Sequence, residues 1–297
     1  MAGNSGNSGN SGNSGNSGNS GNAGTVEGGF FPDRVDLPFV ITVLNPLQPD
    51  RNLSTVRFDA TGRFPARNWA AGWAAWQPLT DFASGTNWKE GLKLPEPPGP
   101  EETNGEIDAL VRAAVDERAD ALGEILSQDA EFIGDFAGLL DMKPTSHPAT
   151  HRVLRIAELV GLFVSMHLKG VHDRKRPSQI CPALRPPIPV PGHSSYPSGH
   201  ATQAFLMAHC LAACAKQALS ESDAASVASA VTALAERIAR NREIAGLHYR
   251  SDTEAGKQLA KGTFDLLIEG GGMAIVENNR TRFANAIFAA GLEWGGS

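Results

Sequence analysis

Hydrophobic residues recur with helical spacing over most of the chain after Asn104. The segment EIDALVRAAVDERADALGEIL predicts one apolar stripe, made of Ile107, Leu110, Val111, Ala114, Val115 and Leu122. AEFIGDFAGLLDM continues this pattern, and HRVLRIAELVGLFVSMHLKG, residues 151–170, predicts a core helix. Further helices are expected at about 199–219, 222–245, 251–270 and 278–290. Because strand patterns are nearly missing, the sequence predicts an all-α fold built as a helical bundle.

The N-terminal third has a different pattern. Residues 3–20 are six copies of Gly-Asn-Ser, a composition too polar to bury a core, which predicts a disordered tract over 1–24. Residues 25–103 are rich in Pro, Gly, Trp and Phe and have little helical period. We therefore expect an irregular, loop-rich N-terminal extension over 25–103 that wraps a helical catalytic domain of residues 104–297.

Local signals divide this extension. FVITVL (39–44) predicts a short strand. NWAAGWAAWQPL (68–79) predicts a helix with Trp73 and Trp76 on one side, closed by Pro78. The PEPPGPEE stretch that follows is typical of a linker.

Charge and composition exclude two classes of partner. The net charge of −6 provides no electrostatic attraction to nucleic acid. No run of 18 apolar residues occurs, because the best candidates contain Glu158, His167 or His209, so no membrane span is expected. Neither a basic n-region nor an apolar h-region opens the chain, which favours a cytoplasmic location. The expected partner is a small molecule, and the sequence leaves the oligomeric state open.

The three cysteines, Cys181, Cys210 and Cys214, suggest no disulfide framework. Cys210 and Cys214 lie four residues apart on a predicted helix. Burial as small apolar side chains explains them better than a zinc site, because further ligands at suitable spacing are missing from the sequence.

Candidate chemistry is concentrated in three short segments. KGVHDRKRP places Lys169 at the end of the predicted core helix and Arg176 seven residues later, before a proline. YPSGHAT opens the next predicted helix with Ser198, Gly199 and His200. A helix start of this kind leaves backbone N–H groups free and is a natural anion site.

The third segment, NREIAGLHYRSD, spaces Arg242, His248 and Asp252 along one stretch. Considered singly, each residue has a structural explanation: cations suit helix C-termini, Asp252 suits a helix start, and a lone histidine suits a core. Considered together, three cations, a helix start and two histidines provide what a tetrahedral oxyanion needs. Cations neutralise the anion, one histidine can bond its central atom, and the other can move protons.

The order K-x6-R-P, P-S-G-H and R-x5-H-x3-D resembles the superfamily shared by type-2 phosphatidic acid phosphatases, bacterial class A acid phosphatases and vanadium-dependent haloperoxidases. All three segments match in order and spacing, over about residues 169–252. One departure is Asn241, where the family pattern usually has serine, but that position is not among the family's direct anion ligands. The resemblance implies a helical bundle that holds phosphate or vanadate.

By matching position, the resemblance also implies a role for each residue. The implied oxyanion ligands are Lys169, Arg176, Ser198, Gly199 and Arg242. His248 is then the residue bonded to phosphorus or to the metal vanadium, and His200 is the acid–base histidine. Asp252 is the carboxylate partner that fixes the tautomer of His248.

The same site serves two reactions. A haloperoxidase would keep vanadate as a cofactor on His248 and oxidise halide with hydrogen peroxide. A soluble phosphatase would need no cofactor and would cleave a phosphoester through a phosphohistidine. A helical module that only binds a phosphorylated partner would need the cations but has no use for the histidine pair.

Two details favour the vanadium-dependent haloperoxidase as the first hypothesis. Arg250 stands where family phosphatases often have proline, and His193 stands where bromoperoxidases tend to carry histidine, so that it would position halide or substrate. The phosphatase is the alternative, because haloperoxidases are usually longer and the algal bromo type has one more residue between the lysine and the Arg-Pro pair.

Overall fold

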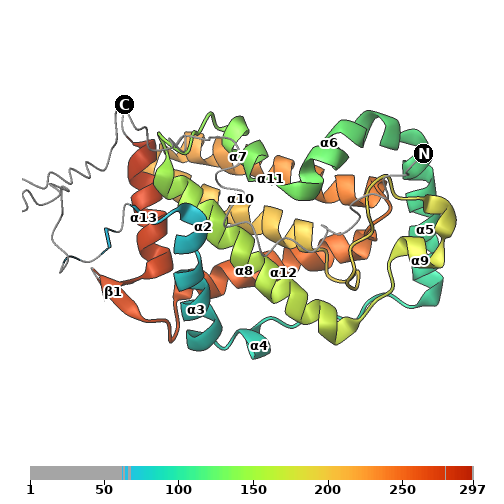
Figure 1. The fold of residues 1–297 in the computed structure, drawn as a ribbon, viewed down its shortest axis with the longest axis horizontal. Coiled ribbons are helices and arrows are strands. Elements are labelled where there is room, and N and C mark those ends of the chain that lie inside the picture. The colour runs from blue at the N-terminus through green and yellow to red at the C-terminus, as the bar shows by residue number, and fades with distance from the viewer. Residues whose placement is uncertain (1–61, 63, 66–67, 278, 296–297) are drawn as a thin grey trace, which may run out of the picture.

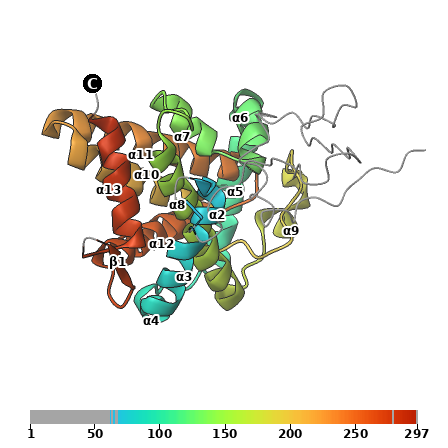
Figure 2. The same ribbon diagram turned by 60° about the vertical axis from the view of Figure 1, so that its left-hand side comes forward.

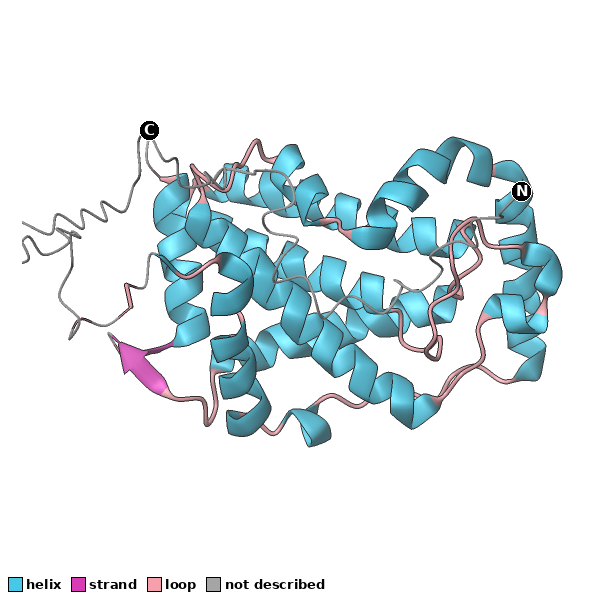
Figure 3. Cartoon of the chain, viewed as in Figure 1, coloured by secondary structure: helices cyan, strands magenta, loops and turns pink. Residues whose placement is uncertain are grey.

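The computed structural model describes residues 62, 64–65, 68–277 and 279–295. The N-terminal helices are α2 (Ala71–Ala74), α3 (Trp76–Gly85), α4 (Trp88–Gly91), α5 (Pro100–Asp116), α6 (Arg118–Ala130) and α7 (Ile133–Leu139). Then follow α8 (Pro148–His172), α9 (Pro177–Ile180), the 3-10 turn η3 (Pro182–Leu184), α10 (Gly199–Ala218), α11 (Glu221–Ile244), α12 (Arg250–Glu269) and α13 (Arg282–Trp294). Among the described residues, strands are limited to the hairpin of β1 (Ile275–Glu277) and β2 (Arg280–Thr281) (Figure 3). The predicted all-α fold is confirmed, whereas the tract 1–24 and the expected strand 39–44 lie outside the described residues.

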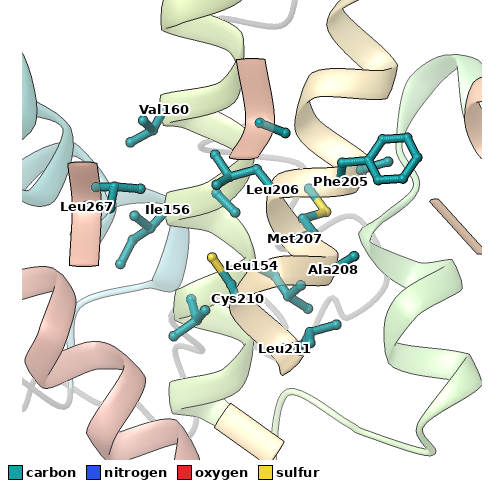
Figure 4. Packing of buried hydrophobic residues seen from close by; sticks show 14 of the residues in the cluster. Leu154, Ile156, Val160, Phe205, Leu206, Met207, Ala208, Cys210, Leu211 and Leu267 are labelled. Atoms are coloured by element: carbon teal, nitrogen blue, oxygen red, sulfur yellow. The ribbon is translucent and has the colours of Figure 1, made fainter. Parts of the chain in front are cut away.

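Helix α10 is the centre of the bundle. It contacts α8, α11, α12 and α13, and its side chains are buried on nearly every face. This burial is possible because α10 is apolar or small all round, unlike a one-sided surface helix. Figure 4 shows Leu206 and Met207 of α10 beside Leu154 and Ile156 of α8.

Cys210 and Cys214 of α10 belong to the same core. Both side chains are fully buried, so the predicted structural role is confirmed. Burial raises the pKa of the Cys214 thiol to about 12, which removes thiolate reactivity near neutral pH.

The predicted core helix is confirmed as α8 and is longer at both ends than residues 151–170. Its N-terminus is held by α13, because the Glu293 carboxylate accepts hydrogen bonds from the backbone N–H groups of Ala149 and Thr150 at 2.7 and 2.8 Å. Its C-terminus is ended by Asp173, which has a left-handed φ of 46°. Lys169 therefore lies in the last turn of α8 rather than at its end.

The expected continuous stripe after Asn104 is only partly correct. Ile107 and Leu110 of α5 are buried as predicted, whereas Val111 and Val115 of the same helix are exposed, so the buried face of α5 is narrower than expected. The chain then turns at Glu117 between α5 and α6, so Leu122 of α6 no longer shares that face and is exposed as well. The pattern breaks again at Glu131, whose carboxylate accepts a hydrogen bond from the N–H of Ile133 at 2.8 Å and so begins α7.

The expected helix 68–79 is two helices, and Pro78 does not close the second. Pro78 lies in the first turn of α3, where its missing N–H has no intrahelical partner to lose. Trp73 and Trp76 are both exposed. Helices α2 and α3 pack on α8, so this part of the extension covers the bundle with short helices joined by loops (Figure 1).

The two ends of the bundle are formed by different elements. Helix α13 and the hairpin lie at one end, and α9 with its flanking loops lies at the other (Figures 1 and 2). Across the residues that the structure describes, no helix combines the length and apolarity needed to cross a membrane.

Candidate active site

Helix ends bring the three sequence segments together. The C-terminal end of α8 and the N-terminal end of α10 meet the last turn of α11 and the first turn of α12. The N–H of Ser198 donates to the carbonyl of Asp252 at 2.9 Å, which joins the starts of α10 and α12. Gly256 makes this approach possible, because a Cβ there would lie 2.7 Å from the carbonyl oxygen of Ser198. Gly256 could not be identified from the sequence, because a glycine inside a helix gives no signal of what it packs against.

Lys169 and Arg176 are buried cations that contact only neutral groups among the described residues. Lys169 is 2% exposed, and its Nζ donates to the carbonyls of Ser194 and Ser195, both at 2.8 Å. Arg176 is 1% exposed and donates from Nε to the carbonyl of His193 and from Nη1 to that of Leu247, both at 2.9 Å.

Burial dominates the titration of both cations. It lowers the pKa of Lys169 to about 7, with Arg176 lowering it further. It also lowers the pKa of Arg176 to about 10. Buried charges are costly unless they are compensated, so the surroundings of these two cations are electrostatically suited to an anion.

Arg242 provides the third cation from the last turn of α11. Its Nη2 donates to Asp129 of α6 at 3.0 Å, whereas its buried Nε and Nη1 have no hydrogen-bond partner in the described part of the chain. Asn241 beside it points to α6 instead, donating to Glu124 and Gln128 at 2.9 Å each. The departure from the family pattern at Asn241 thus anchors α6 and leaves Arg242 in the pocket.

The start of α10 adds backbone donors. Ser198 is the N-cap, and its Oγ accepts from the N–H of Ala201 at 3.3 Å while its own O–H stays free to donate. The N–H groups of Gly199 and His200 have no backbone partner among the described residues. Gly199 lies next to the lysine, because a Cβ there would be 3.9 Å from Cε of Lys169.

His248 is held by Asp252 in a buried pair. Nδ1 of His248 lies 3.1 Å from Oδ2 of Asp252 and 3.4 Å from Oγ of Ser195, whose hydroxyl also donates to that carboxylate oxygen. Burial first, and the neighbouring cations next, keep the pKa of His248 well below its usual value. His248 is therefore neutral, with its hydrogen on Nδ1 and the Nε2 lone pair free. Ser195 gave no signal of this role in the sequence.

His200 has the opposite tautomer. Its Nε2 lies 3.0 Å from the carbonyl of Gln128, and a carbonyl only accepts, so Nε2 carries the hydrogen and Nδ1 is the site for a second proton. The ring packs on Phe132 with centroids 5.2 Å apart. Burial and then Arg242 keep the pKa of His200 well below its usual value.

The two residues that favoured the haloperoxidase hypothesis have different surroundings. His193 lies at the pocket, with Nδ1 3.1 Å from Nη2 of Arg176, and burial followed by Lys169 lowers its pKa to about 4. Arg250 is 54% exposed and pairs with Glu254 and, at 3.6 Å, with Glu243. Arg250 thus forms its ion pairs outside the group of site residues.

Arg174 lies inside the first segment, but its sequence position did not predict a role in the site. Its Nη1 donates to Oδ1 of Asp252 at 2.8 Å, and its guanidinium carbon lies 3.8 Å from the ring centroid of Tyr249. The only sequence signal was an additional basic residue two positions before Arg176. The spacing along the chain did not indicate that its partner would be Asp252.

Comparison with known proteins gives a family match for the middle of the chain. The family model described as the PAP2 superfamily matches residues 153–263. A crystal structure of a transmembrane PAP2-type phosphatidylglycerolphosphate phosphatase from Bacillus subtilis is similar at 15% identity and a TM-score of 0.35, covering 66% of this chain and 83% of that one. No curated protein matches the chain. Residues 153–263, which hold all three segments of the site, thus match the PAP2 superfamily.

Proposed function

We propose that the chain is a phosphatase that cleaves a small phosphoester through a phosphohistidine at His248. The observation that carries this proposal is the set of three buried cations whose charge the described residues leave under-compensated. Within the described part of the chain, Lys169 and Arg176 contact only neutral groups, and the buried Nε and Nη1 of Arg242 have no hydrogen-bond partner. A phosphoryl dianion would supply the missing charge and acceptors.

The histidine pair distinguishes catalysis from simple anion binding. His248 offers the Nε2 lone pair, because Asp252 holds the hydrogen on Nδ1. In this proposal, Nε2 attacks phosphorus, the N–P bond forms, and the bond to the leaving oxygen breaks. His200 gives the proton on its Nδ1 to that oxygen.

Hydrolysis of the intermediate reverses these roles. Water attacks phosphorus and breaks the N–P bond, while His200 takes a proton from the water through Nδ1. The low pKa of His200 comes from burial and from Arg242. A bound dianion opposes both effects, because it offsets the cationic field and favours the protonated imidazole.

Vanadate also suits this pocket. It is a tetrahedral oxyanion like phosphate, and the unpartnered Nε and Nη1 of Arg242 fit its oxygens as well as those of phosphate. When bound, it would supply Lewis-acid chemistry toward peroxide, as the haloperoxidase hypothesis requires. Of the two residues that favoured that hypothesis, Arg250 pairs outside the site and only His193 remains beside it. The phosphatase therefore becomes the first hypothesis, and the family match supports it better than it supports the haloperoxidase.

Trapping with a denaturing alkaline quench after reaction with a ³²P-labelled aryl phosphate tests the proposal. We expect an acid-labile, alkali-stable phosphoenzyme in the wild type and none in His248→Ala. His147→Ala, which removes a histidine at the start of α8, is the control and should retain the label. Bromide oxidation by the vanadate-loaded protein, together with no phosphoester cleavage by the metal-free protein, would reject the phosphatase in favour of the haloperoxidase.

A further inference from the structure

Arg174 connects the site to a helix outside the three segments. Its side chain is 8% exposed, and it lies in the loop between α8 and α9. Nη1 donates to Oγ of Ser251 at 2.7 Å and to Oδ1 of Asp252 at 2.8 Å. Nη2 donates to Oε2 of Glu106 at 2.9 Å and to Oγ1 of Thr103 at 3.2 Å. One guanidinium thus bridges two carboxylates, one from α5 and one from α12.

Glu106 holds the same turn of α12 from the other side. Its Oε1 accepts from the N–H of Ser251 at 2.7 Å, and its Oε2 accepts from the Ser251 hydroxyl at 2.8 Å. Glu106 and Arg174 therefore fix the first turn of α12 by side-chain and backbone contacts together. Glu106 lies outside residues 153–263, so this contact is supplied by a part of the chain that the family match does not cover.

These contacts decide what each oxygen of Asp252 can do. Oδ1 is taken by Arg174, and Oδ2 receives the N–H of Tyr249 at 3.1 Å, the hydroxyl of Ser195 and Nδ1 of His248. The carboxylate is fully buried and has no freedom to rotate without losing one of these bonds. Arg174 therefore fixes the Oδ1 side of the carboxylate, while Tyr249 and Ser195 fix the Oδ2 side that faces His248.

We propose that Arg174 and Glu106 are a positioning pair for His248: they hold the Asp252 carboxylate so that the imidazole keeps its hydrogen on Nδ1 and presents Nε2 to the anion pocket. The consequence for turnover rests on the proposed phosphatase function, whereas the effect on the imidazole does not.

Arg174 also weakens the electrostatic interaction between the Asp252 carboxylate and His248. Its guanidinium neutralises part of the Asp252 carboxylate, so removing it leaves that carboxylate with a stronger attraction for imidazolium and raises the pKa of His248. The other titratable or charged groups around His248 are Lys169 on α8, His193 and Arg176 in the flanking loops, His200 on α10 and Arg242 on α11. These groups are unchanged in an Arg174 variant, so a shift would report on the Asp252 contact.

Nitrogen NMR of the full chain with ¹⁵N-labelled histidine rings tests the pair without requiring any activity. The His248 signals are assigned by their loss in His248→Gln. We expect the wild type to show one tautomer with the hydrogen on Nδ1. Arg174→Met should show a mixture of tautomers and a higher titration midpoint for His248. Glu106→Gln should change both in the same direction but by less. Arg174→Lys should give values between those of the wild type and Arg174→Met.

Lys175→Met is the matched control, because Lys175 is an exposed neighbouring cation. It should leave the His248 signals unchanged. Under the proposed phosphatase, kcat should fall about tenfold or more in Arg174→Met, with KM changed much less, as for other residues that orient a reacting group through a second side chain.

The outcomes separate the two proposals. Unchanged His248 signals in a folded Arg174→Met, or in Glu106→Gln and Arg174→Lys if the first variant does not fold, overturn the positioning pair and leave the phosphatase standing. A shifted tautomer in a protein that cleaves no phosphoester overturns the phosphatase and leaves the positioning pair standing.

Discussion

Nδ1 of His248 lies 3.1 Å from Oδ2 of Asp252, four residues further along the chain, and both side chains are buried. A carboxylate oxygen only accepts a hydrogen bond, so this contact fixes where the imidazole hydrogen lies. It also leaves Asp252 with a second task, because the same oxygen caps α12 through the N–H of Tyr249. The carboxylate that orients His248 and the cap of α12 are thus one group.

Asp252→Asn should separate these two tasks. The amide oxygen can still accept from Tyr249, but it carries no charge for Arg174 and cannot hold His248 as firmly. We expect kcat per folded molecule to fall about 100-fold, with a lower midpoint of thermal unfolding because Arg174 loses a buried ion pair. Asp265→Asn, on the exposed face of α12, is the control for loss of a carboxylate. Full turnover in Asp252→Asn would reduce Asp252 to a structural cap.

Alanine variants of the two histidines should lose different parts of the reaction. His248→Ala removes the atom that would bond phosphorus, so we expect no phosphoenzyme and no turnover. His200→Ala removes only the proton donor, so phosphate should still bind, while turnover falls by about 100-fold or more. Calorimetry with phosphate and quench-flow with an aryl phosphate measure the two effects. Loss of the phosphoenzyme in His200→Ala with retention in His248→Ala would mean that the roles are exchanged.

Lys169 should make phosphate binding proton-coupled. Burial lowers the pKa of Lys169 to about 7 from its usual value of 10.5. Between these values the unfolded chain holds a proton that the folded chain has lost, so this residue makes the folded state more stable as pH rises through that window. A bound anion reverses the shift, because it favours the ammonium form.

At pH 8 we therefore expect phosphate binding to take up close to one proton at Lys169, and affinity to fall as pH rises further. The binding enthalpy measured in two buffers of different ionisation enthalpy gives the number of protons. Lys169→Met should bind more weakly and take up correspondingly fewer protons. Identical proton uptake in the two proteins would assign the coupling to the histidines instead.

The three motif segments could be placed at one site from sequence because each combines a helix end with a charged or titratable side chain. Helix ends bind anions for general reasons, and the order of the motifs supplied the rest. The structure adds residues whose roles depend on contacts between distant segments, such as Asp129 against Arg242 and Glu106 against Arg174. Such contacts depend on where α5 and α6 turn, and the hydrophobic pattern ran across the turn at Glu117 without marking it.

Asn241→Ser tests one of these distant contacts. Serine is the usual family residue at this position, but it is too short to reach both Glu124 and Gln128 on α6. We expect the free energy of unfolding to fall by about 1–3 kcal/mol, because a buried acceptor is left without its donor. Phosphate affinity should change less than about twofold, equivalent to ~0.4 kcal/mol. A large loss of affinity at unchanged stability would show that Asn241 acts on the anion pocket itself.

His193 is the residue that best separates the two chemistries. Its Nδ1 lies 3.1 Å from Nη2 of Arg176 and 3.2 Å from the carbonyl oxygen of Ser194. Nη2 of Arg176 also donates to that carbonyl at 3.5 Å. His193→Ala therefore leaves Arg176 with an alternative acceptor, and the cation stays in the pocket. For a small aryl phosphate we expect hydrolysis by the metal-free protein to change less than about threefold, equivalent to ~0.7 kcal/mol in the barrier. The companion measurement is bromide oxidation by vanadate-loaded protein with hydrogen peroxide, in the wild type and in His193→Ala. Bromide oxidation that depends on His193, beside phosphoester hydrolysis that is negligible in both proteins, would restore the haloperoxidase as the function of this site.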